Sequence, residues 1–328
     1  MDWIVRGVLP RAELAVIYGD SGSGKTFLAL DLCAAITRGV EWRSRRTQKG
    51  RVVYVCAEGA GGFKARLRAY ARGHEVVLAE LPAVIADAPN LLEPKDAAAI
   101  AKAVIDWGPV DVIVVDTLSA TTPGGNENSG EDMGLVLSHC KFLHRKTGAL
   151  VVLIHHSGKD ATRGARGWSG LRAAADAEIE VVRNADYRAA TVTKMKDGGD
   201  GESYPFKLRV VELGLDVEGE PESSCVVEHV DEVPREAVTG RQKPIGRHQI
   251  VVYEALKTMA PSGTVHIDDL LAGYVAKMPP TGGKRDQRRR DGQRALADLC
   301  AKKLAFMHDD ERVSLTSLVT SGDDGWLD

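Results

Sequence analysis

Residues 17–30 have the sequence IYGDSGSGKTFLAL, and the eight residues from Gly19 to Thr26 match the phosphate-binding pattern G-x-x-x-x-G-K-[ST]. An apolar run, LAVIY at 14–18, precedes the glycines, and an apolar helical pattern follows them. This order of strand, glycine-rich loop and helix is the context that a P-loop requires. The stretch therefore predicts an α/β domain that binds a nucleotide.

The loop residues have separate predicted roles. Backbone N–H groups of the loop and the helix N-terminus are expected to hold the α- and β-phosphates of ATP. Lys25 is expected to reach the β/γ oxygens, and Thr26 to ligate Mg²⁺. The predicted nucleotide-binding residues are Gly19, Asp20, Ser21, Gly22, Ser23, Gly24, Lys25, Thr26 and Phe27.

Length and composition limit the class of protein. With 328 residues and 44% apolar residues, the chain can form one large and one small domain. The net charge of −3 gives no global attraction to nucleic acid, so such binding would need local basic patches. The five cysteines include no C-x-x-C pair, and no stretch approaches the length of a membrane span. We expect a cytoplasmic protein with no membrane partner.

Further apolar runs indicate a mostly parallel sheet in residues 1–230. Continuous β-branched runs suit strands that are buried on both faces between helices, and they occur at 51–58, 83–86, 110–117 and 149–156. Three later runs, separated by short turns, predict an antiparallel extension at one sheet edge, namely 177–183, 189–196 and 205–213. The acidic segment 216–224 is expected to be a hairpin tip.

The C-terminal part differs in pattern. Residues 231–246 are polar and contain two prolines, which predicts a linker. Residues 247–328 show three helical patterns and a hairpin, which favours a small winged helix-turn-helix domain over a simple helical bundle. A basic cluster in the third helix indicates a surface for duplex DNA or replication proteins, the alternative being a solvated face, and it contains Lys284, Arg285, Arg288, Arg289, Arg290 and Arg294.

Two acidic residues complete the predicted ATP site. Asp116 ends the apolar run VIVVD and is expected to hold the magnesium ion through water. The next residue is Thr117 rather than an acid, so the carboxylate that activates water has to come from another strand. Glu58 follows the run VVYVCA and would face the γ-phosphate if its strand lies beside the P-loop strand.

These motifs together resemble the RepA-type branch of hexameric helicases with a RecA fold. The resemblance covers residues 1 to about 215 and includes the P-loop, Glu58, Asp116 with TLS after it, and IHHSGKDATRGARGWSGLRAAADAEIEV. It implies that His155 or His156 is a γ-phosphate sensor. It also implies that the basic loop 157–170 contacts single-stranded DNA through Lys159, Arg163 and Arg166, whereas an ordinary solvated loop is the alternative. The acidic loop 119–132 would gate the central channel of the ring.

The same resemblance implies an ATP site shared between subunits. Lys194 and Lys196, two apart on a strand, match the basic pair that reaches the neighbouring subunit's nucleotide in RecA-fold relatives. DnaB-type helicases usually have Lys-x-Arg at this place, so Arg166 or Arg172 could supply the arginine finger instead. Either assignment implies a homo-oligomer, expected to be a hexameric ring.

The leading hypothesis is therefore a ring-forming replicative DNA helicase, from a phage or mobile element, that hydrolyses ATP and moves along single-stranded DNA. A RecA- or RadA-like recombination ATPase would use the same core. A regulatory ATPase that binds DNA through a winged helix is a further alternative. A small-molecule kinase is disfavoured because no Arg-rich lid follows the core.

Overall fold

The computed structural model describes two compact units, which span 1–238 and 239–328. The described residues are 2–156, 169–184, 186–216, 218–231, 246–261, 263–279, 286–301, 304–308 and 311–315. Most of the predicted linker, 231–246, lies outside them. Each unit has its own core and is described separately. No helix in the described part is long and apolar enough to cross a membrane.

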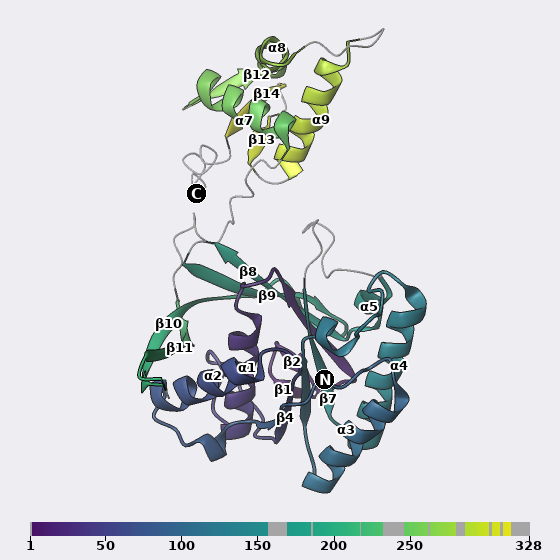
Figure 1. Ribbon diagram of the computed structural model, residues 1–328. Coiled ribbons are helices and arrows are strands. Elements are labelled where there is room, and N and C mark those ends of the chain that lie inside the picture. The colour runs from purple at the N-terminus through teal and green to yellow at the C-terminus, as the bar shows by residue number, and fades with distance from the viewer. Residues whose placement is uncertain are drawn as a thin grey trace, which may run out of the picture. The chain divides into compact units, whose positions relative to one another are not determined.

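Among the described residues, the large unit contains a nine-stranded sheet in the order β11-β10-β9-β8-β3-β7-β6-β4-β5. Its strands are drawn as arrows in Figure 1. Strands from β8 to β5 in this order are parallel, and β8 to β11 form an antiparallel meander. The predicted mostly parallel sheet with an antiparallel extension is confirmed. The strands are β3 (Leu14–Gly19), β4 (Val52–Cys56), β5 (Ala83–Ile85), β6 (Val112–Asp116), β7 (Leu150–His156), β8 (Ala177–Asn184), β9 (Tyr187–Met195), β10 (Ser203–Leu215) and β11 (Pro221–His229).

Helices cover both faces of this sheet, which explains why its central strands are continuous apolar runs. Two helices share one core with one face of the sheet, α1 (Lys25–Arg38) and α2 (Ala60–Gly73). The other face is covered by α3 (Pro94–Trp107), α4 (Gly130–Thr147) and the short α5 (Ser169–Ala174). The remaining short elements are β1 (Trp3–Val5), β2 (Leu9–Pro10), and the 3₁₀ turns η1 (Leu78–Glu80) and η2 (Ser119–Thr121).

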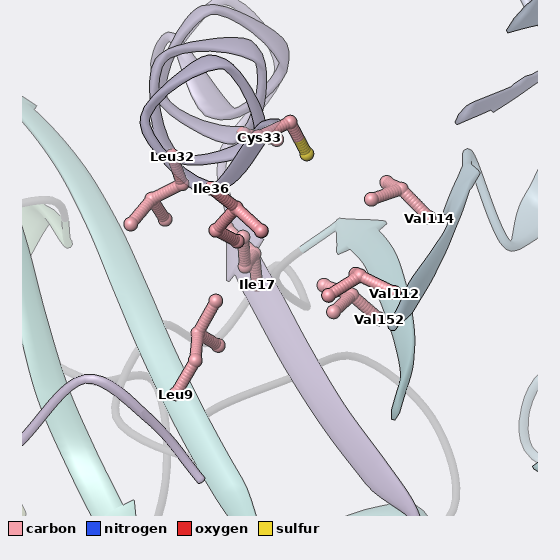
Figure 2. Close-up of a pocket in the computed structure, with 9 residues that line it drawn as sticks. Leu9, Ile17, Leu32, Cys33, Ile36, Val112, Val114 and Val152 are labelled. Carbon is pink, nitrogen blue, oxygen red and sulfur yellow. The ribbon is translucent and has the colours of Figure 1, made fainter. Parts of the chain in front are cut away.

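The packing between α1 and the sheet leaves little space. Figure 2 shows Leu32, Cys33 and Ile36 of α1 facing Ile17 of β3 and valines of β6 and β7 across a small apolar cavity. Its volume of about 10 Å³ is at the lower limit for one water molecule, and its lining is apolar. The helix that follows the P-loop is therefore held against the sheet by close packing.

A buried carboxylate also holds α1. Asp31 is 3% exposed, and its Oδ2 accepts a hydrogen bond of 2.7 Å from the indole Nε1 of Trp42. His229 Nε2, at the end of β11, lies 3.3 Å from the same oxygen. Burying a carboxylate is costly unless it is hydrogen-bonded, and these partners supply that compensation. The contact joins α1 to the loop after it and to the last strand of the sheet.

The start of the P-loop passes very close to β8. A Cβ atom built on Gly19 would lie 2.1 Å from the carbonyl oxygen of Val181. Real Cβ atoms do not approach backbone this closely, so only glycine fits here unless β8 moves. The first glycine of the motif therefore allows the antiparallel extension to lie against the P-loop.

In its described residues, the small unit has three helices and a three-stranded sheet in the order β12-β14-β13. The predicted helices and hairpin are present, whereas the short strand β12 was not predicted. Leu256, Tyr274 and Leu296 form part of its core. These elements are compatible with a winged helix, which stays a prediction. They are α7 (Arg247–Met259), β12 (Thr264–His266), α8 (Ile267–Lys277), α9 (Arg288–Ala301), β13 (Ala305–Met307) and β14 (Arg312–Leu315).

The close approach at Gly19 gives a first testable prediction. Gly19→Ala should lower the free energy of unfolding by roughly 3 kcal/mol, because the new methyl group forces β8 away from the P-loop. Gly134→Ala is the matched control, since Gly134 lies inside α4 and, outside that helix's own backbone, no described residue has an atom within 4 Å of its Cβ position. It should stabilise the protein by about 0.5–1 kcal/mol. Urea unfolding followed by tryptophan fluorescence measures both, and equal effects would contradict the packing argument.

Candidate nucleotide-binding site

The P-loop connects the end of β3 to the start of α1. Gly22 and Gly24 have φ angles of 73° and 101°, values that residues with a side chain rarely adopt. Gly24 is the N-cap of α1, and no side chain of the described residues forms a capping hydrogen bond there. Its first N–H groups and its dipole thus face the loop, an arrangement that binds phosphate. The predicted strand, loop and helix are therefore all present.

Lys25 is the first residue of α1, and its side chain reaches the first residues of the loop. Its Nζ donates to the carbonyl oxygens of Gly19 and Asp20, each at 2.9 Å, and lies 3.4 Å from Nδ1 of His156. Burial lowers the pKa of Lys25, although the nearby carboxylates of Asp116, Asp20 and Glu58 oppose that shift. The lysine charge is thus placed at the loop where the β- and γ-phosphates are expected.

The two histidines of β7 have different surroundings. In the register of β7 with β3, His155 is opposite Tyr18 and His156 is opposite Gly19. His155 is fully buried, whereas His156 is partly exposed and reaches Lys25. Burial and the charge of Lys25 lower the pKa of His156, so its imidazole is neutral near pH 7 and can accept from Lys25. The geometry brings His156, rather than His155, to the P-loop lysine.

Asp116 is the centre of a buried hydrogen-bond group at the end of β6. Its Oδ2 accepts from Thr26 Oγ1 at 2.8 Å and from the Tyr54 hydroxyl at 2.6 Å. Burial raises the pKa of Asp116, and the two hydrogen bonds lower it. Burial and Asp116 raise the pKa of Tyr54 well above its usual value, so the phenol remains a donor. The hydroxyl of Thr26 and the carboxylate of Asp116 are oxygen ligands of the kind that Mg²⁺ prefers.

Glu58 reaches the site by a different route from the predicted one. The premise that its strand lies beside the P-loop strand is wrong, because β7 and β6 separate β4 from β3. Glu58 also lies two residues beyond the end of β4. Because these strands are all parallel, their carboxyl ends still meet at one sheet edge. There Glu58 Oε2 accepts from Thr117 Oγ1 at 3.1 Å, which fixes its carboxylate next to Asp116.

The predicted basic pair lies at the other side of β3. Lys194 Nζ donates to the carbonyl oxygens of Arg172 at 2.5 Å and Ala175 at 2.6 Å, at the C-terminal end of α5. Lys196 Nζ lies 3.3 Å from Asp176 Oδ1, and Arg172 Nε lies 3.4 Å from Glu178 Oε2. All three cations have partners within this chain. Their action on a neighbouring subunit stays a prediction.

The predicted DNA contacts are only partly within the described residues. Lys159, Arg163, Arg166, Lys284 and Arg285 lie outside them. Arg288 binds Asp286 and donates to the carbonyl oxygens of Val275 and Met278 at the end of α8. Arg289 forms an ion pair with Asp268. These contacts tie the start of α9 to α8, and DNA binding by this surface stays a prediction.

Sequence reasoning missed two groups near the loop. Tyr54 lies in the middle of an apolar strand, so its sequence context is that of an ordinary core residue. The available signal was its hydroxyl, because a hydroxyl in a fully buried strand needs a hydrogen-bond partner. Arg188 lies in β9, and its stem contacts the position of Gly24. No local pattern indicates this second contact, because it depends on how the β8–β9 pair lies against the P-loop.

Parts of this chain are similar to known proteins. Residues 1–162 match the family model of the AAA domain. The RecA proteins of Aquifex pyrophilus and Aquifex aeolicus (strain VF5) are each 29% identical over 228 residues, which cover 64% of this chain and 57% of theirs. The chain thus spans little more than half the length of these relatives. The crystal structure of the RadB recombinase matches with a TM-score of 0.46 and 17% identity, over 60% of this chain and 87% of that one.

The sequence matches and the observed sheet support a P-loop ATPase core with a RecA fold. The narrower resemblance to RepA-type helicases goes beyond these matches and stays a prediction.

The hydrogen bond from Tyr54 to Asp116 can be tested directly. Tyr54→Phe removes one of the two donors to Asp116 Oδ2. It should raise the Mg²⁺ concentration that ADP binding requires by roughly tenfold, because loss of a supporting contact at a metal ligand lowers metal affinity. Calorimetric titration of ADP at several Mg²⁺ concentrations measures this effect. Tyr204→Phe is the control, because the buried Tyr204 hydroxyl has no hydrogen-bond partner in the described part of the chain. A similar loss in both variants would contradict the assigned role.

Burial of Asp116 also predicts a pH dependence of stability. The pKa of Asp116 in the folded state is raised above its ordinary value of 3.8. Ionisation of Asp116 therefore destabilises the folded state as the pH rises from 3.8 through the folded pKa. Asp116→Asn should therefore have a higher Tm than the wild type at pH 7, and the difference should shrink as the pH falls toward 3.8. Thermal unfolding in EDTA without nucleotide measures this. A gain that grows on acidification would contradict the sign.

Proposed function

We propose that this protein is an ATP hydrolase that forms a ring and translocates on single-stranded DNA as a replicative helicase, of the kind found in phages or mobile elements. The observation that carries the proposal is the convergence of Lys25, Thr26, Asp116, Glu58 and His156 at one edge of the sheet. Duplex DNA or replication proteins are the proposed partners of the small unit.

Each residue has a distinct part in the proposed hydrolysis. The P-loop N–H groups and Lys25 would hold the phosphates of ATP, and Thr26 and Asp116 would hold Mg²⁺, which would supply positive charge to offset the phosphate charge. Glu58 accepts the proton of the attacking water, and Thr117 holds its carboxylate in place. His156, next to Lys25, responds to the presence of the γ-phosphate.

The coupling to DNA involves the neighbouring subunit. Arg172, Lys194 or Lys196 is proposed to stabilise charge on the transferring phosphoryl group of the adjacent site, so that hydrolysis depends on assembly. Lys159, Arg163 and Arg166 are proposed to bind DNA phosphates, since lysine and arginine among glycines suit contact that is independent of sequence.

A second candidate is a recombination ATPase that forms filaments on DNA. Its support is the similarity to two RecA proteins over 64% of this chain. Both candidates use the same ATP site. A helicase separates a forked duplex, whereas a recombinase exchanges strands between homologous duplexes, so these two assays distinguish them.

The proposal predicts the behaviour of two site variants and of DNA. Single-stranded DNA should stimulate ATP turnover of the wild type at low salt. Glu58→Gln keeps an acceptor for Thr117 but removes the base, so it should bind ATP normally and lose about a hundredfold or more in kcat. Lys25→Ala should lose nucleotide binding itself. Steady-state phosphate release and ATP titration measure these effects.

The outcomes separate the parts of the proposal. Absence of DNA stimulation would exclude a DNA motor while leaving the ATP site intact. Normal turnover by Glu58→Gln would remove Glu58 from the chemical step. Mixing Lys196→Ala with Lys25→Ala subunits should restore some turnover if the site is shared between subunits, and no restoration would count against sharing.

A further inference from the structure

The β8–β9 pair brings two arginines to the P-loop of the same subunit. Arg183 in β8 and Arg188 in β9 are directly paired in the antiparallel register, so their side chains lie on the same face of the sheet. β8 is also the neighbour of β3, and its backbone touches the start of the P-loop at Gly19. Both arginines are therefore placed next to the predicted phosphate site.

The contacts with the loop are specific. A Cβ built on Gly24 would lie 2.9 Å from Cδ and 3.1 Å from Nε of Arg188, so the missing side chain at Gly24 makes room for this arginine. Phe206, opposite Arg188 in β10, lies 3.5 Å from the same position. Arg183 Nη1 lies 4.0 Å from the Cβ position of Gly22. One arginine thus lies against the start of α1 and the other against the crest of the loop.

Arg188 is an unusual side chain for a purely structural position. It is only 9% exposed, and its buried Nε has no hydrogen-bond partner in the part of the chain described here. Its Nη1 donates to the carbonyl oxygen of Asp186 at 3.3 Å. A buried donor without a partner is costly, and like charges directly opposite each other on paired strands are destabilising. Burial and the charge of Arg183 accordingly lower the pKa of Arg188.

An anion at this place would relieve both costs. A planar guanidinium binds phosphate through two parallel hydrogen bonds, and these charge-assisted bonds are stronger than neutral ones. The N-terminus of α1 favours an anion at the same point. We infer that Arg183 and Arg188 contact the phosphate chain of the nucleoside di- or triphosphate bound by their own subunit's P-loop.

This inference rests on the proposed nucleotide site, but not on the helicase activity. It differs from the shared-site proposal because these arginines act in cis. It also explains the packing of the antiparallel extension against the P-loop, since the extension would supply part of the phosphate site. The chain would then surround the phosphates with groups from β3, α1, β8 and β9.

Binding of MgADP and of magnesium pyrophosphate to the full chain tests the inference. Arg188→Gln and Arg183→Gln should each weaken both probes by roughly tenfold, the size of one charge-assisted contact. Arg209→Gln is the matched control, because Arg209 is an exposed arginine in β10 whose Nη2 donates to Gly73, away from the P-loop. It should bind both probes as the wild type does. Isothermal titration calorimetry gives the affinities.

Thermal unfolding adds a readout that a structural role would not produce. Arg188→Gln should keep or raise the Tm of the protein alone, because it removes a buried charge, and should reduce the rise in Tm that MgADP causes. If Arg188→Gln fails to fold, the exposed Arg183→Gln and the conservative Arg188→Lys decide the question. Arg188→Lys should lose several-fold in affinity, because lysine lacks the planar fork.

The results discriminate clearly. Unchanged affinity for MgADP in Arg183→Gln and Arg188→Lys would overturn the inference and leave the helicase proposal intact. Weaker MgADP binding with unchanged pyrophosphate binding would assign the arginines to the base or ribose and also overturn it. Normal MgADP binding by the wild type without DNA-stimulated turnover would exclude the helicase and leave this inference in place. A wild type that binds neither probe would overturn both.

Discussion

The central constraint in this protein is that the parallel strands are buried on both faces. Side chains inside β3, β7, β6 and β4 contact helices above and below, so polar groups are excluded from most of their length. Polar side chains can therefore gather only where the strands end. The P-loop, Asp116, Glu58 and His156 all lie at the carboxyl ends of these strands, where the sheet geometry brings them together.

Tyr54 is the exception that supports this view. Its ring stacks on Phe63 inside the core, with centroids 4.4 Å apart, and its hydroxyl is used by Asp116. A single strand position thus serves both packing and the site. Two P-loop glycines also serve both packing and the site. The absence of a side chain at Gly19 leaves room for the backbone of β8, and its absence at Gly24 leaves room for the stem of Arg188. The phosphate loop and the antiparallel extension therefore fit each other as one structure.

The sequence allowed prediction of most strands and helices, because apolar runs, glycines and strand-end acids are local signals. The order of the strands was not predictable in the same way, since it depends on where each crossover places the next strand. For this reason the sequence places Glu58 correctly at the carboxyl ends of the strands, but on the wrong premise that β4 lies directly beside β3. Tyr54 and Arg188 were missed because their roles depend on tertiary contacts. Arg288, whose charge suggests a DNA contact, donates to carbonyl oxygens at the end of α8.

The buried carboxylate of Asp31 has a mechanical consequence. The first turn of α1 belongs to the P-loop, and in the next turn Asp31 contacts Trp42 and His229. His229 is the last residue of β11, shortly before the chain leaves the described part of the large unit. A rigid-body shift of α1 would have to break a buried, charge-assisted contact. The helix that begins at the phosphate loop and the end of β11 are therefore joined by one buried contact, so a displacement of α1 would also be felt where β11 ends.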